Sequence, residues 1–189
     1  MVQILSLLAL AGTALAHGGV LSYNIAGTTY KGFVPYNSPT GQSTIQREWG
    51  KSHHVLRQGH PLTPRPPDSY NPIQDPTSAG MTCNLNGAKA ALSATVAAGS
   101  SITAYWNNPW PHNIGPMVVW MANCGGSCSS FSGTGNVWFK IEQAGLISGT
   151  LSKGLWGSGE MVNNGSSWVR FQRLESALNA VLTSDANRL

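Results

Sequence analysis

The sequence has 189 residues, a formal net charge of +4, only 10% charged side chains and 22 glycines. Its length is that of a single domain, and so few charges beside so much Gly, Ser, Thr and Asn exclude a charged helical bundle. The basic excess comes from two segments, residues 50–69 and 169–189, and not from one face, so we expect no nucleic-acid partner.

Residues 1–16 read MVQILSLLALAGTALA and contain no charged side chain. An apolar run followed by small residues that end at Ala16 is typical of a secretory signal peptide. A membrane anchor needs about 20 apolar residues, more than this run offers, and a buried first strand is the other alternative. We therefore expect a secreted, extracellular protein that begins at His17 and has no membrane partner after signal removal.

Short apolar runs separated by Gly, Pro and Asn follow along residues 17–168. In residues 91–106, ALSATVAAGSSITAYW, apolar side chains alternate with Ser and Thr on both sides of a Gly-Ser-Ser turn. Alternation with a period of two predicts half-buried strands. The sequence thus predicts one all-β domain over 17–168, an antiparallel β-sandwich of the immunoglobulin or fibronectin kind with long loops.

Two segments do not fit this pattern. Residues 50–69 contain three histidines among Pro and Gly, which predicts a loop. In residues 169–189, Phe171, Leu178 and Leu182 recur at helical spacing and predict a short amphipathic helix. Both segments start with residues whose codons can form an intron donor sequence, so we interpret them as translated introns: an aberrant insert and a tail. A genuine insertion loop and a genuine C-terminal helix are the alternative.

The sequence contains three cysteines, an odd number for a secreted protein. Cys124 and Cys128, in NCGGSCSS, could close a small disulfide loop around a Gly-Gly-Ser turn. A metal site is the competing interpretation, but it lacks the second cysteine pair that such sites use. Cys83 is the third cysteine, and in an oxidising compartment an odd count suggests that something is absent.

Cleavage after Ala16 would give His17 two ligand groups, its α-amine and its imidazole. The amine has a pKa of only about 7.7–8.0, so it can become neutral and bind a metal. One more histidine would complete three nitrogen ligands, a set that suits copper. The candidate is His112, in a loop (NNPWPHNIGP, residues 107–116) that three prolines stiffen. Taken alone, a loop histidine is more often an ordinary surface or core residue.

Five motifs in this order, HGGV, GTTYKG, PWPHNIGP, WMANCGGSC and FKIEQAGL, resemble the fungal lytic polysaccharide monooxygenases of auxiliary activity family nine, formerly glycoside hydrolase family sixty-one. The resemblance covers residues 17–168 without the 50–69 segment. It implies an immunoglobulin-like sandwich with a flat face. It also implies one copper ion held by a histidine brace of His17 and His112, and a small disulfide between Cys124 and Cys128.

The activity that this resemblance implies is oxidative cleavage of β-1,4-glucan such as cellulose, at C1 or C4. The partners would be an external electron donor and O2 or H2O2, and we expect a monomer. A non-catalytic carbohydrate- or copper-binding sandwich is the alternative. A hydrolase would need a pair of carboxylates, which no motif supplies. One further feature is NGS at Asn164, an acceptor pattern for N-glycosylation.

The sequence departs from the family after Trp168. There the family has an Arg-His-Glu motif, then a Gln and a Tyr before a Cys, and none of these occurs here. We therefore expect the last strands of the sandwich to be missing, with sheet edges left unpaired. The predicted helix could not replace their hydrogen bonds. Low stability, weaker copper binding and impaired turnover would follow.

Overall fold

A computed structural model describes most of the sandwich. The residues it describes are 17–37, 42–49, 70, 72–84, 87–163, 168–171 and 180–185. The predicted signal peptide (1–16), the 50–69 segment and Asn164 lie outside these residues.

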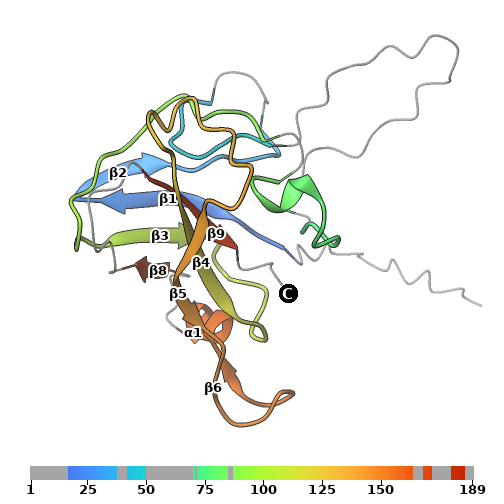
Figure 1. Ribbon diagram of the computed structural model, residues 1–189. Helices are drawn as coiled ribbons and strands as arrows, with labels where there is room; N and C mark the ends of the chain where they lie inside the picture. The colour runs from blue at the N-terminus through green and yellow to red at the C-terminus, as the bar shows by residue number, and fades with distance from the viewer. Residues whose placement is uncertain are drawn as a thin grey trace, which may run out of the picture.

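The described chain forms two larger antiparallel sheets and a small hairpin (Figure 1). In the four-stranded sheet the order is β2 (Thr28–Lys31), β1 (Val20–Ile25), β3 (Ile102–Trp106) and β8 (Trp168–Phe171). In the three-stranded sheet it is β5 (Trp138–Ala144), β4 (Met117–Asn123) and β9 (Ala180–Asp185). The hairpin pairs β6 (Leu146–Ser148) with β7 (Leu155–Trp156).

Helix is scarce in this fold. The described part contains one 3-10 turn, η1 (Ala79–Met81), and one short α-helix, α1 (Gly157–Asn163). No helix among these residues combines the length and the apolar character needed to cross a bilayer. The all-β prediction is confirmed.

The core lies between the two larger sheets. In β3, Ile102, Ala104 and Trp106 are buried while Tyr105 is exposed, as alternation along a strand requires. Met117 and Val119 of β4 join the same buried cluster from the opposite sheet. Because one cluster contains side chains of both sheets, the two sheets pack face to face, and the predicted sandwich is confirmed.

The helix predicted within 169–189 is wrong where the structure describes this segment. Strand β8 pairs with β3, and strand β9 pairs with β4, both antiparallel. The sequence predicted unpaired sheet edges, but at these two places β3 and β4 each have a partner strand. The sequences of β8 and β9 contain β-branched and aromatic residues, which are favoured in strands. An open sheet edge also offers their backbone groups a ladder of hydrogen bonds. That tertiary context outweighs the helical spacing.

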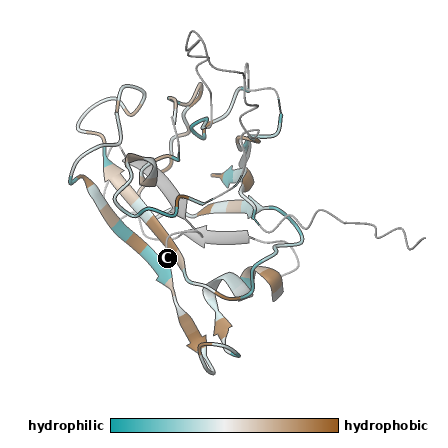
Figure 2. Cartoon of the chain, turned by 90° about the vertical axis from the view of Figure 1, so that its right-hand side faces the viewer, coloured by the Kyte–Doolittle hydropathy of each residue, from teal (hydrophilic) through white to brown (hydrophobic). Residues whose placement is uncertain are grey.

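The β6–β7 hairpin extends from the sandwich beside α1 (Figure 1). Its strands and tip carry apolar side chains, which Figure 2 shows as brown segments at the lower end of the molecule. Leu151, in the connecting turn, is 72% exposed, and Leu146 and Ile147 are also exposed. This hairpin lies outside the buried core.

Candidate functional site

The structure brings His17 and His112 together, as the sequence predicted. Their ring centroids are 5.5 Å apart, with 45° between the ring planes, and both side chains are half-buried. His17 precedes β1, and His112 lies in the loop between β3 and β4. Since β1 and β3 are antiparallel neighbours, with Val20 opposite Trp106, the start of one strand lies beside the end of the other.

Two hydrogen bonds extend this pairing toward the histidines. The backbone N–H of Asn107 donates to the carbonyl oxygen of Gly19 at 3.2 Å. In return, the N–H of Gly19 donates to the side-chain Oδ1 of Asn107 at 2.7 Å. The segment that carries His17 is thus fastened to the first residue of the loop that carries His112.

Close packing explains why glycines follow His17. A Cβ on Gly18 would lie 2.8 Å from a ring carbon of Trp110. A Cβ on Gly19 would lie 2.3 Å from a ring carbon of Tyr70. Side-chain contacts this short do not occur without displacement of the neighbour. The two glycines therefore let the chain pass between two aromatic rings before it reaches β1.

Trp110 is the buried support of the histidine loop. It is 4% exposed and packs edge-on against Trp106, with ring centroids 5.1 Å apart. Its ring also meets the ring of His112 at 5.8 Å, with 61° between the planes. The contact with Trp106 holds the Trp110 ring, and that ring in turn restricts the rotamer that His112 can adopt.

The far end of the same loop is held by α1. The backbone N–H and the hydroxyl of Ser158 both donate to the carbonyl oxygen of Gly115, at 3.1 and 2.8 Å. Ser158 is buried. The loop is therefore anchored at Asn107, at Trp110 and at Gly115, on both sides of His112.

The chemistry of the pair fits a copper ion. The Nε2 atom of His112 is buried and has no hydrogen-bond partner, which is costly unless another group binds it. The ring centroids are 5.5 Å apart, a spacing that leaves room for one ion between the two rings. Among the described residues no three His, Cys, Asp or Glu side chains cluster into a metal site.

Tyr70 lies against the segment that follows His17, and its hydroxyl is a polar group of interest. Its hydroxyl is buried and has no hydrogen-bond partner. Burial, and to a smaller extent the neighbouring Tyr36, raises the pKa of Tyr70 to about 12. The phenol therefore remains neutral at any ordinary pH. Tyr36 packs edge-on against it at 5.4 Å and is itself 50% exposed.

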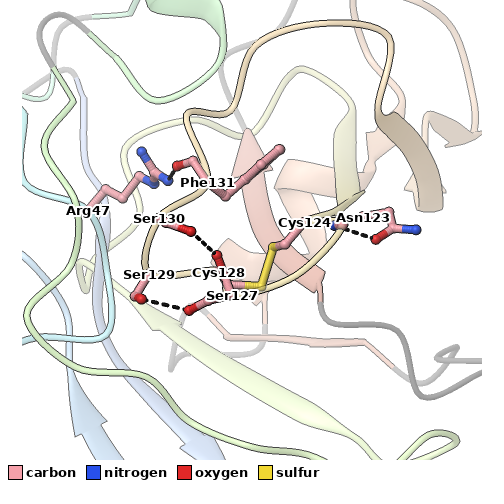
Figure 3. Close-up of a disulfide and its surroundings, with 9 residues drawn as sticks. Arg47, Asn123, Cys124, Ser127, Cys128, Ser129, Ser130 and Phe131 are labelled. Carbon is pink, nitrogen blue, oxygen red and sulfur yellow. Dashed lines mark hydrogen bonds between the residues drawn. A yellow bond between two sulfur atoms is a disulfide. The ribbon is translucent and has the colours of Figure 1, made fainter.

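The predicted disulfide between Cys124 and Cys128 is present (Figure 3). It closes a loop at the end of β4, whereas His112 precedes the start of that strand, so the two features lie at opposite ends of β4. The side chain of Arg47 donates to the carbonyl oxygen of Phe131 and ties this loop to residues 42–49. Because both sulfurs are bonded to each other, the alternative of a cysteine metal site is wrong.

Sequence reasoning named the two histidines but missed the groups that position them. Gly18, Gly19, Asn107 and Tyr70 received no role, although Gly-Gly directly after a candidate ligand is a signal of close packing. Tyr70 has no such local signal, because its contact with Gly19 depends on the fold.

The fold and the histidine pair define a class: an antiparallel β-sandwich with a two-histidine site where its first strand begins. The chain belongs to Auxiliary Activity family 9 (formerly GH61), whose family model matches residues 17–172.

Known relatives agree with this assignment. The chain is 55% identical over 173 residues to AA9 family lytic polysaccharide monooxygenase B of Heterobasidion irregulare, covering 89% of this chain and 63% of that protein. It is 42% identical to AA9 family lytic polysaccharide monooxygenase-like protein CEL1 of Agaricus bisporus, covering 88% of this chain and 50% of the relative.

Two crystal structures have the same fold. HiLPMO9B superposes with a TM-score of 0.64 at 53% identity, over 89% of this chain and 62% of that one. A cellulose-active polysaccharide monooxygenase from M. thermophila gives a TM-score of 0.65 at 35% identity, over 83% of this chain and 62% of that one. The chain thus spans half to two thirds of the length of these relatives.

Proposed function

We propose that this chain is a secreted copper-dependent monooxygenase that cleaves β-1,4-glucan oxidatively. The observation that supports it most is the His17–His112 pair, with a buried and unpartnered Nε2 on His112, in a chain of Auxiliary Activity family 9. Removal of residues 1–16 by a signal peptidase would free the α-amine that completes the ligand set.

Each residue of the site has a distinct task in this proposal. His17 would bind copper through its amine and its ring, and His112 through its ring. Trp110 restricts the orientation of the His112 ring, and Ser158 fixes the end of the loop. Bound copper would supply the one-electron redox chemistry that activates O2 or H2O2, with electrons from an external donor.

Cellulose or a related β-glucan is the substrate that we propose. A family relative from M. thermophila is described as cellulose-active, which supports this choice. The proposal includes attack at C1 or C4, action as a monomer and N-glycosylation at Asn164.

A non-catalytic copper- or carbohydrate-binding sandwich is the second candidate. The observation in its favour is the histidine pair itself, because two histidine rings can bind copper with or without turnover.

The test uses the processed protein, loaded with one equivalent of Cu(II) and incubated with amorphous cellulose and ascorbate in air. Mass spectrometry of the soluble products should detect oligosaccharides with oxidised ends. His112→Ala should abolish them, whereas His60→Ala, a histidine without an assigned role, should not. Copper binding without any oxidised product would favour the binding protein, and products from His112→Ala would refute the proposal.

A further inference from the structure

We propose that Asn107 is a positioning residue that holds His17 against His112. The consequence for copper rests on the proposed function, but the contact itself does not. Asn107 directly follows β3 and belongs to the same loop as His112, while Gly19 belongs to the same segment as His17. A single side chain therefore joins the two segments that carry the histidines.

The contact is made by the side chain as well as by the backbone. Oδ1 of Asn107 accepts the N–H of Gly19 at 2.7 Å. The same side chain lies so close to Gly18 that a Cβ there would be 2.9 Å from Oδ1 and 3.2 Å from the Asn107 Cβ. Asn107 thus lies against both residues that follow His17 and restricts the path of the backbone that leads to His17.

An acceptor at this position is needed for a physical reason. Gly19 is buried, so its N–H would lose its partner if Asn107 were replaced by an apolar residue. An unsatisfied buried donor destabilises the docked arrangement. The backbone bond from Asn107 to Gly19 does not depend on the side chain of residue 107, so the docked state should be depleted rather than abolished. Apparent copper affinity falls in proportion to the docked fraction.

The experiment compares Asn107→Leu with two other variants of the processed protein. Asn107→Asp keeps an oxygen acceptor and is the conservative rescue. Asn123→Leu is the matched control, because Oδ1 of Asn123 also accepts a glycine N–H, that of Gly125, in the disulfide loop. Three readouts are recorded: the Kd for Cu(II), the electron paramagnetic resonance spectrum of bound Cu(II), and the exchange rate of the Gly19 amide without metal.

Asn107→Leu should weaken Cu(II) binding about three- to tenfold, alter the Cu(II) spectrum and accelerate exchange of the Gly19 amide. Asn107→Asp should restore slow exchange, and Asn123→Leu should change none of the three readouts. If Asn107→Leu does not fold, Asn107→Ala removes the acceptor without added bulk and carries the same expectations.

A folded Asn107→Leu or Asn107→Ala protein with wild-type exchange, affinity and spectrum would overturn the inference. If the wild-type protein itself binds no Cu(II), the proposed function fails. Amide exchange, measured without metal, then still decides whether Asn107 holds the segment in place.

Discussion

Replacement of Gly19 by alanine should destabilise the protein measurably, because the added methyl group meets the ring of Tyr70. The new Cβ would lie 2.3 and 2.7 Å from two ring carbons of Tyr70. Ordinary contacts between such carbons are about 3.5–4.0 Å, so either the ring or the segment after His17 must move. Overpacking of this kind costs about 1–3 kcal/mol.

Urea unfolding of four proteins measures this cost: wild type, Gly19→Ala, Tyr70→Leu and the double variant. Leucine is shorter than tyrosine and leaves room for the methyl group. The cost of Gly19→Ala should therefore fall by about 1 kcal/mol or more in the Tyr70→Leu background, a coupling that a double-mutant cycle reports directly. Gly126→Ala is the control, since a Cβ at that position meets nothing within 4 Å.

Two results would refute this reasoning. The free energy of unfolding of Gly126→Ala should stay within about 0.5 kcal/mol of the wild-type value. One refuting result is that Gly19→Ala stays as close to the wild type as this control does. The other is an equal cost of Gly19→Ala in both backgrounds, which would mean that Tyr70 is not the obstacle.

Three further predictions concern stability. Trp110→Ala should cost about 3–5 kcal/mol in urea unfolding. Trp110→Phe should cost less than about 1.5 kcal/mol, because the buried indole N–H has no partner to lose; equal costs would contradict the packing described here. The pKa of Tyr70 is about 12 in the folded protein and about 10 in the unfolded chain. Its ionisation therefore leaves the free energy of unfolding unchanged below pH 10 and lowers it as the pH rises from 10 toward 12. Tyr70→Phe should reduce that alkaline loss, while the part due to Tyr23, whose pKa is also raised by burial, should remain; an unchanged pH profile of the melting temperature would argue against it. The double variant Cys124→Ser, Cys128→Ser should lose about 2 kcal/mol, because the disulfide closes only a short loop, and a loss near 5 kcal/mol would show that the loop does more than restrict the unfolded chain.

Local patterns predicted part of the sandwich. Alternation along residues 102–106 marked the buried face of β3. The matching alternation along residues 91–97 also predicted a strand, and that prediction is wrong, because this stretch is not a strand and Leu92 is exposed. The tail was predicted wrongly because helical spacing in 169–189 is a local signal, whereas β8 and β9 depend on edges supplied by distant strands. The residues of 169–189 alone do not show which sheet edges will be available to pair with them.

The candidate site was also predictable only in part from the sequence. His17 and His112 could be named from the sequence, since one follows a cleavage pattern and the other lies in a loop rich in proline. The contacts that fix their separation could not be named, because Asn107 and Gly19 meet only through the register of β1 on β3. The sequence thus indicated the two candidate ligands, and the fold supplied their geometry.

The central claim is that the amino group of His17 and the ring of His112 bind copper together. A Cu(II) titration of two proteins tests it, one beginning at His17 and one retaining Ala16, which differ by a single residue. We predict tight binding of one ion by the first protein and a large loss of affinity in the second, whose free amine lies one residue away from the imidazole. Equal affinity in the two proteins would contradict the account.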